Sequence, residues 1–217
     1  MTDRLFLTAA ELPPRPDPTT GEPRPPRAPG LLHPQRSAQQ RERARVTDPS
    51  KAPAPPAGQG PLLTWFKTSR REALLITATG IPLFPLGVTV LQGFSIEWMK
   101  YWLPWLVMIP FVLAIYSVQR TVECSAGAEW LQVGKTWVRL YELTKITAKH
   151  RSSAIHIDFE DSTGREVRVQ ADDLQHNREL WDLVYNGILH SVIAGDAKTN
   201  SLLHSSFRIP RPENRTQ

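Results

Sequence analysis

Two long apolar runs joined by a short polar link constrain the fold of this chain more than any other feature. The runs span residues 73–94 and 101–118, so they contain 22 and 18 residues without a charged side chain. A helix that crosses a bilayer needs about 20 apolar residues, because each residue adds only about 1.5 Å. The six residues 95–100 between the runs are too few to form a domain. We therefore expect two antiparallel transmembrane helices joined by an external link.

The residues that flank the runs predict the orientation of this hairpin. Lys67, Arg70 and Arg71 precede the first run, and the link holds only one Lys. Because cytoplasmic flanks carry more Lys and Arg, both termini are expected on the cytoplasmic side of the plasma membrane. We expect the same three residues, in the interfacial segment 62–72, to contact anionic lipid headgroups. Aromatic residues also mark membrane interfaces, so the expected interfacial anchors are Trp65, Phe66 and Trp98.

Neither apolar run contains an ionisable residue. Ion and proton pathways through membranes usually need a buried ionisable group. The two spans are therefore expected to anchor the chain instead of forming a transport path. The runs also contain four prolines, Pro82, Pro85, Pro104 and Pro110, each of which predicts a kink.

Residues 1–61 are predicted to form a disordered tail. They hold 14 of the 20 prolines and almost no β-branched or aromatic residues. Such a segment buries too little surface to offset its chain entropy, and it favours polyproline II conformations. Residues 1–72 carry a net charge of +5, whereas residues 119–217 are neutral. The tail is either a solvated tether or a docking arm for a partner or for lipid. No nucleic-acid contact is expected, because the basic charge does not lie in a folded domain.

Short alternating runs between residues 120 and 194 predict a small antiparallel sheet of five or six strands. Strand candidates on either side of Gly134 and Lys135 suggest a tight turn. The clearest hairpin pairs AIHIDFE with REVRVQA across the turn at residues 161–164. An amphipathic helix is expected from about residue 174 to 193, after Asp172 and Asp173 as N-terminal caps. Residues 195–217 are predicted to be disordered.

This order of elements resembles the bacterial pleckstrin-homology-like (PH-like) domains that follow a pair of transmembrane helices. The likeness rests on EWLQVGKTWVRLYELTKITA, AIHIDFEDSTGREVRV and ELWDLVYNGILHSVI, within residues 120–194. The expected fold class is thus an α+β membrane protein with a two-helix transmembrane hairpin. A small antiparallel sheet or partly open barrel, capped by one C-terminal helix, follows the hairpin. The resemblance implies a binding or assembly module without catalysis.

The sequence contains no pattern typical of an enzyme. Phosphate-binding loops, dinucleotide-binding fingerprints, nucleophile elbows and zinc-protease motifs are all missing. No cofactor or metal is expected, since the histidine spacings match no common ligand pattern. Asp158, Glu160 and Asp161 are interpreted as a solvated face instead of a catalytic pair. Cys124 is expected to be a buried small residue in a first strand, with lipid attachment as the alternative.

A short basic edge offers one further candidate site. Lys145, Lys149 and Arg151 form this edge and suit either a solvated face or contact with anionic headgroups near the membrane. We expect a non-enzymatic membrane protein that presents a PH-like interaction or scaffold domain. Its expected partners are membrane lipids and a protein that binds the tail or the domain. Two alternatives remain, an anionic-lipid sensor and an accessory subunit of a membrane transport or DNA-transfer complex.

Overall fold

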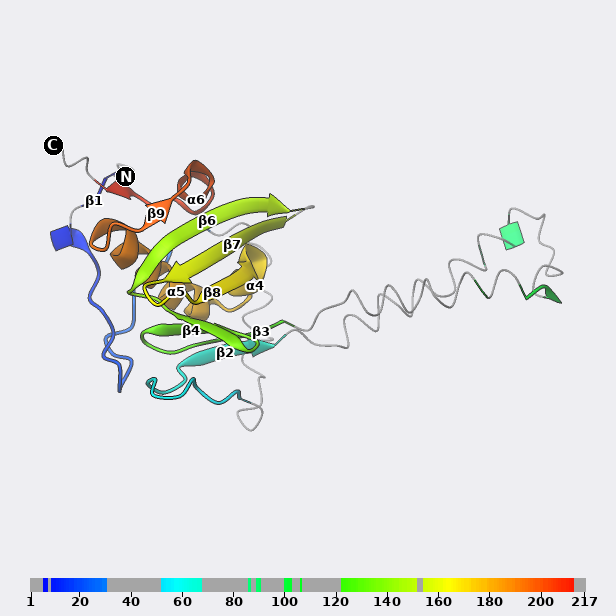
Figure 1. Cartoon of the computed structure of the whole chain (residues 1–217), viewed down its shortest axis with the longest axis horizontal. Coiled ribbons are helices and arrows are strands. Elements are labelled where there is room, and N and C mark those ends of the chain that lie inside the picture. The colour runs from blue at the N-terminus through cyan, green and yellow to red at the C-terminus, as the bar shows by residue number, and fades with distance from the viewer. Residues whose placement is uncertain are drawn as a thin grey trace. The chain divides into compact units, whose positions relative to one another are not determined.

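The computed structural model describes residues 6–7, 9–30, 52–67, 86, 89–90, 100–102, 106, 122–151 and 154–212. The chain divides into two compact units, Met1–Phe66 with Glu123–Gln217, and Lys67–Val122. The first unit contains two four-stranded sheets and the helices that cover them (Figure 1). Only scattered positions of the second unit are described, so the fold below is that of the first.

The first sheet has the strand order β2-β3-β4-β5. Its strands are β2 (Thr64–Lys67), β3 (Glu123–Ala126), β4 (Trp130–Val133) and β5 (Thr136–Arg139). Strands β4 and β5 are antiparallel, with Val133 opposite Thr136. The chain reverses at Gly134, where φ is +60°, a conformation that residues with a Cβ atom disfavour. The predicted hairpin around Gly134 and Lys135 is confirmed.

The second sheet has the order β8-β7-β6-β9. Its strands are β6 (Leu143–Arg151), β7 (Ala154–Asp161), β8 (Glu166–Gln170) and β9 (Lys198–Thr199). Strands β6, β7 and β8 are antiparallel neighbours, whereas β9 pairs with β6 in parallel. Ile157 and Phe159 are at most 1% exposed, and the intervening Asp158 is half-buried on the other face. The second predicted hairpin is therefore confirmed.

Two consecutive helices, α4 (Ala171–His176) and α5 (Arg178–Ile193), replace the single helix that the sequence predicts. Asp172 and Asp173 lie inside α4 and do not cap it. Asn177 separates the helices and caps α5, because its side-chain oxygen accepts hydrogen bonds from the N–H groups of Glu179 at 3.0 Å and Leu180 at 3.4 Å.

The chain after α5 is also folded. Helix α6 (Ser201–Phe207) buries Leu203 and Phe207 completely, and the Phe207 ring lies 5.4 Å from the Trp181 ring. Strand β10 (Arg211–Pro212) then pairs in parallel with β1 (Phe6–Leu7), just before the short 3-10 helix η1 (Ala9–Glu11). The structure thus differs from the predicted disordered segment 195–217, because α6 has apolar residues to bury against α5.

Helix α5 is the centre of the unit. Fourteen of its sixteen residues are buried. A helix on a protein surface normally buries only one stripe, so this burial requires cover on both sides. On one side Gly187 lies against Leu140, the residue that follows β5. A Cβ atom added to Gly187 would lie 2.6 Å from the Leu140 Cβ atom. The other side is covered by the N-terminal segment, which the sequence predicts to be disordered.

The predicted fold class is wrong. Among the residues that the structure describes, no helix has the length and apolar character needed to cross a membrane. The predicted spans 73–94 and 101–118 and the link 95–100 fall outside these residues, except at 86, 89–90, 100–102 and 106. The described architecture is a two-sheet, sandwich-like unit with short helices. The membrane hairpin, the two-span plasma-membrane location and the cytoplasmic placement of both termini are corrected accordingly.

The reason for this error is that hydropathy reports composition and not backbone hydrogen bonding. A membrane span must satisfy every backbone N–H and C=O group internally. Each proline in the apolar runs lacks the N–H group that continues a helical ladder. Four prolines at positions 82, 85, 104 and 110 therefore weaken the helical interpretation that the apolar count suggests.

Candidate functional site

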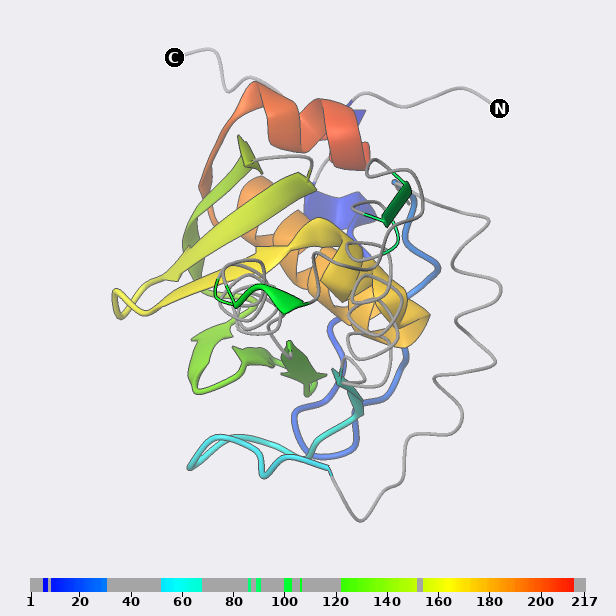
Figure 2. The same ribbon diagram turned by 90° about the vertical axis from the view of Figure 1, so that its right-hand side faces the viewer.

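The N-terminal proline-rich segment, residues 13–30, lies along α5 and is called the strap below. Figure 2 shows this segment in blue beside the orange α5 helix. Proline fixes φ and removes the N–H donor, so the two ends of the strap, residues 13–16 and 24–30, have no helix or strand and offer mostly carbonyl oxygens, whereas residues 17–22 form a turn that is closed by a backbone hydrogen bond between Asp17 and Glu22. A protein surface that holds these ends must therefore supply hydrogen-bond donors. The prediction that residues 1–61 are disordered is wrong for the strap, because α5 supplies these donors.

The first part of the strap is bound at the C-terminal half of α5. The His190 Nε2 atom donates to the carbonyl oxygen of Pro13 at 2.7 Å, and Asn186 donates to that of Pro14 at 3.3 Å. Arg15 donates from Nε to His190 Nδ1 at 3.3 Å, and its guanidinium group lies 4.9 Å from the centre of the Tyr141 ring. Since Nδ1 accepts and Nε2 donates, His190 is a neutral imidazole in this arrangement.

The last part of the strap is bound at the N-terminal half of α5. The Ala28 N–H group donates to Asp182 Oδ1 at 2.8 Å, and the Ala28 carbonyl oxygen accepts from Arg178. Trp181 Nε1 donates to the Pro29 carbonyl oxygen at 3.1 Å. Ala28 is only 3% exposed, so the strap is seated in the surface and does not merely rest on it.

The strap ends at a close approach to α6. Gly30 has a φ of +74°, and a Cβ atom added there would lie 2.4 Å from the Phe207 carbonyl oxygen. Gln175 of α4 donates to the Gly30 carbonyl oxygen at 2.9 Å. A side chain at position 30 would therefore push the strap away from α6.

Four residues of α5 at four-residue intervals form the recognition surface, which we call the polar stripe. These residues are Arg178, Asp182, Asn186 and His190. Every one of them makes a hydrogen bond to the backbone of the strap. Residues four apart lie on the same face of a helix, so the stripe follows the helix axis. The stripe contacts backbone groups of the strap, which every polypeptide segment carries. Proline has no N–H group to pair with a neighbouring carbonyl oxygen, so the carbonyl oxygens of a proline-rich segment are free to accept from the stripe.

Burial sets the ionisation of the stripe. Burial raises the pKa of Asp182, although the Ala28 N–H group and Arg178 oppose this rise. Burial also lowers the pKa of His190, Arg15 adds to this effect, and the Pro13 carbonyl group opposes it. Both shifts disfavour the charged form, and each of the four contacts between the stripe and the strap backbone is a hydrogen bond.

A second proline-rich segment, residues 52–63, contacts both the first sheet and the strap. The Gly60 carbonyl oxygen accepts from Trp130 Nε1 at 3.0 Å, and the Leu63 N–H group donates to the Ala126 carbonyl oxygen at 3.0 Å. A Cβ atom at Gly60 would lie 2.0 Å from the Pro18 carbonyl oxygen, so the two segments cross in direct contact. Residues 52–61 are therefore also ordered against the domain.

The basic edge predicted from the sequence is paired with carboxylates. Lys145 Nζ lies 3.3 Å from Glu160 Oε2, and Lys149 Nζ lies 2.9 Å from Asp158 Oδ2 on the neighbouring strand. Arg151 is exposed at the end of β6. Pairing leaves less positive charge for a lipid headgroup than the sequence suggests. The predicted headgroup contact of these three residues stays a prediction.

The predicted interfacial residues are only partly described. Trp65 and Phe66 lie in β2, where the Trp65 carbonyl oxygen accepts from Asn177 at 3.3 Å and the Phe66 ring stacks on His176 at 4.8 Å. Lys67 is the last residue of β2. Arg70, Arg71 and Trp98 lie outside the described residues. Their predicted role as lipid contacts and anchors stays a prediction.

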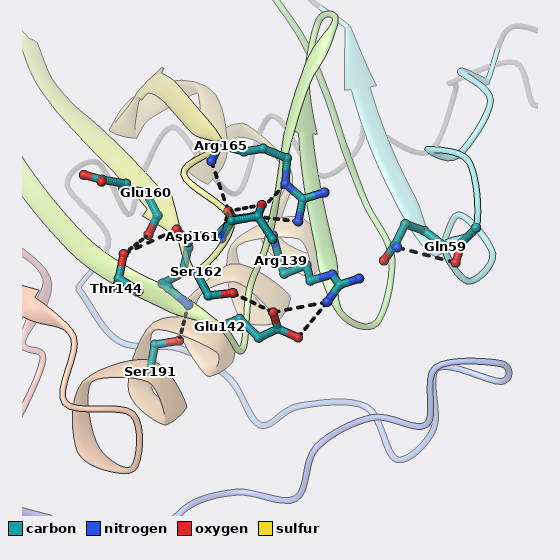
Figure 3. A network of polar contacts seen from close by, with 12 residues as sticks. Gln59, Arg139, Glu142, Thr144, Glu160, Asp161, Ser162, Arg165 and Ser191 are labelled. Atoms are coloured by element: carbon teal, nitrogen blue, oxygen red, sulfur yellow. Dashed lines mark hydrogen bonds and ion pairs between the residues drawn. The ribbon is translucent and has the colours of Figure 1, made fainter.

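Asp161 differs from the predicted solvated acidic face. Its side chain is fully buried and accepts hydrogen bonds from Thr163 at 2.7 Å and Arg165 at 2.8 Å (Figure 3). Burial alone would raise the pKa of Asp161, but these hydrogen bonds outweigh it and lower the pKa. Arg165 also lies 3.6 Å from the centre of the Trp137 ring. Asp161 therefore holds the turn between β7 and β8 together.

Cys124 is a buried residue of β3, as the sequence predicts. Burial raises the pKa of its thiol to about 12. A thiol that stays protonated at neutral pH is a poor nucleophile, so Cys124 fills space in the core.

Comparison with known protein families, curated proteins and solved structures finds no match to this chain.

The polar stripe was not predicted from the sequence. The helix was predicted from its apolar residues at four-residue spacing, without the polar residues at the same spacing, although both patterns are visible in RELWDLVYNGILH. A polar residue on every turn of a helix that is otherwise apolar is a signal that a second segment covers this side.

Proposed function

We propose that this chain is a non-catalytic protein-interaction module that binds a proline- and arginine-rich segment along α5, with one end of the segment at each half of the helix. The observation that carries the proposal is the polar stripe, in which each residue bonds the backbone of the strap. In the structure the chain's own strap occupies this surface. A proline-rich segment of a partner is the class of ligand that fits the same contacts.

The chemistry of the strap supports this proposal. Prolines at both ends of the strap restrict φ before binding, so these ends lose less conformational entropy when they bind than a flexible segment would, and the turn between them is held by its own hydrogen bonds. Domains that bind proline-rich segments commonly combine aromatic side chains with donors to peptide carbonyl groups. Here Trp181 donates to Pro29 and Tyr141 packs against Arg15. Aromatic side chains and a donor to a peptide carbonyl group are therefore both present where the strap binds.

The other functions expected from the sequence have less support. Lys145 and Lys149 each face a carboxylate, so no described contact favours a lipid-headgroup site over the polar stripe. The resemblance to PH-like domains and the role as an accessory subunit stay predictions. The proposal does not depend on either of them.

An exchange experiment on the full chain tests the proposal. A protease site is inserted between residues 31 and 51, and the cleaved protein is passed over a gel-filtration column. We expect the N-terminal fragment to remain bound without a covalent link and to exchange with a labelled peptide of residues 9–30. A scrambled peptide of the same composition is the control.

Variants of the stripe make this test specific. Asn186→Ala combined with His190→Gln should weaken peptide binding roughly tenfold or more, because two hydrogen bonds are lost or altered. The exposed Ser205→Ala should leave binding unchanged. If the fragment leaves the column separately from a folded domain and the labelled peptide does not bind, the proposed function is wrong.

A further inference from the structure

A cavity of about 300 Å³ lies between the strap and α5. Pro26 and Arg27 line it from the strap, Tyr185 and Leu189 from α5, and Arg208 from the segment after α6. This volume is at the lower end of the range for small-molecule sites in proteins. The cavity therefore suits a compact molecule and not a polypeptide chain.

Two guanidinium groups give this cavity its charge. The residues Arg27 and Arg208 are exposed, and within the described part of the chain neither side chain has a hydrogen-bond or ion-pair partner. Arg208 adopts a positive φ of 54°, and its carbonyl oxygen accepts from the Tyr185 hydroxyl group at 3.0 Å, which fixes the backbone there. The planar fork of a guanidinium group matches the two oxygens of a carboxylate.

Asp182 is the carboxylate that lines the same cavity, and its charge is already compensated. Its Oδ1 atom accepts from the Ala28 N–H group at 2.8 Å and from Arg178 Nε at 3.1 Å. Arg27 also favours the charged form of Asp182, so this one carboxylate is set against the three guanidinium groups of Arg27, Arg178 and Arg208, and among these residues positive charge is in excess.

We infer that this cavity binds a small organic carboxylate with a compact apolar body, held by Arg27 and Arg208. The prolines of the strap, Tyr185 and Leu189 supply the apolar wall that such a body needs. Inorganic phosphate matches the charge but not this wall. The inference rests on the proposed function in one respect, since the docked strap supplies part of the site.

Binding at this cavity regulates the strap by linkage. The carboxylate contacts Arg27 on the strap and Arg208 on the domain, so its site is complete only while the strap is docked. A ligand that binds one state of a protein stabilises that state. The carboxylate therefore holds the strap on α5 and opposes its exchange with a proline-rich partner.

The probe for this site is benzoate, tested on the full chain by calorimetry and by thermal unfolding. We expect saturable binding at millimolar concentration, a higher unfolding temperature and slower exchange of the labelled strap peptide. The double variant Arg27→Gln with Arg208→Gln should bind benzoate roughly tenfold more weakly or worse. Arg24→Gln is the matched control, because Arg24 is also an exposed strap arginine but pairs with Glu22.

Three results would overturn the inference. These results are an affinity for benzamide or inorganic phosphate equal to that for benzoate, benzoate binding that survives the double variant, and no detectable saturable binding of benzoate. Retention of the cleaved strap fragment is measured in the same samples. If the fragment is retained and benzoate does not bind, the carboxylate site alone is wrong. If the fragment is not retained and the labelled peptide does not bind, both the site and the proposed function are wrong.

Discussion

His190 joins the strap to the helix through both of its ring nitrogens. Nε2 donates to Pro13 and Nδ1 accepts from Arg15, so protonation would remove the acceptor and place two cations together. Burial lowers the pKa of His190 below its ordinary value, and Arg15 contributes to the same shift. Because the pKa of this base is lower in the folded state than in the unfolded state, its neutral form stabilises the fold and its protonated form destabilises it.

This arrangement predicts a loss of stability in mild acid. Because the folded pKa is depressed, the contribution of His190 is present above the unfolded pKa of about 6.5 and is lost as the pH falls through the lower folded pKa. Urea unfolding at pH 7.5 and pH 5.5 measures the effect. Wild-type protein should lose more free energy of unfolding between these two values than His190→Gln, which keeps a donor but does not titrate.

The comparison with His190→Gln isolates this residue from other groups that titrate in the same range. Burial raises the pKa values of Asp182 and Asp173 in both proteins, so their effects cancel in the difference. An equal loss of stability in the wild type and in His190→Gln would show that His190 has no part in the pH dependence.

At the scale of elements, Asn177 connects three of them. Its side-chain oxygen caps α5, and its side-chain nitrogen donates to Thr64 at 2.7 Å and to the Trp65 carbonyl oxygen at 3.3 Å. One residue thus ends α4, begins α5 and fixes the edge strand β2. The helix N-terminus would otherwise keep unsatisfied N–H groups.

Substitution at Asn177 should separate its two roles. Asn177→Ala removes the cap and the contacts with β2, and should cost about 1–2 kcal/mol of unfolding free energy. Asn177→Asp keeps an acceptor for the cap and for the Thr64 hydroxyl group, and should cost less than half as much. Chemical denaturation of both variants checks this order. A larger loss in Asn177→Asp than in Asn177→Ala would contradict the role of the cap.

Local patterns predicted the elements whose partners are close in sequence. The alternation in AIHIDFE and the turn at Gly134 fixed two hairpins, because each strand pairs with its neighbour along the chain. The strap, α6 and the polar stripe could not be predicted in the same way. Prolines in the strap predict an extended backbone, but Ala28 and Asp182 are 154 residues apart, and no local pattern states which surface an extended segment will meet.

At the scale of the whole unit, the strap and α6 stabilise the same part of α5. Trp181 donates to Pro29 of the strap, and its ring lies 5.4 Å from the Phe207 ring of α6. Gly30 at the end of the strap lies against the Phe207 backbone. Residues that share a partner are expected to be coupled in their effect on stability.

A double-mutant cycle should detect this coupling. The two changes are deletion of residues 1–30 and Phe207→Leu, which keeps an apolar side chain but removes the ring that packs on Trp181. We expect the combined loss of unfolding free energy to be smaller than the sum of the separate losses by about 0.5–2 kcal/mol. Urea unfolding of the four proteins measures it. Ser205→Ala in place of Phe207→Leu should give additive losses, and additivity in both cycles would contradict the coupling.

The position of the strap in the chain also sets an order of events during synthesis. Residues 13–30 leave the ribosome before α5 is made, and at about 5–20 residues per second the delay is on the order of ten seconds or more. A proline-rich segment can wait in this way, because it has few apolar groups to aggregate and needs no partner strand. During that interval the nascent strap has no α5 of its own chain to bind, but it can meet the α5 helix of a finished copy of the protein. Translation is therefore the first setting in which the straps of two chains compete for one α5 helix.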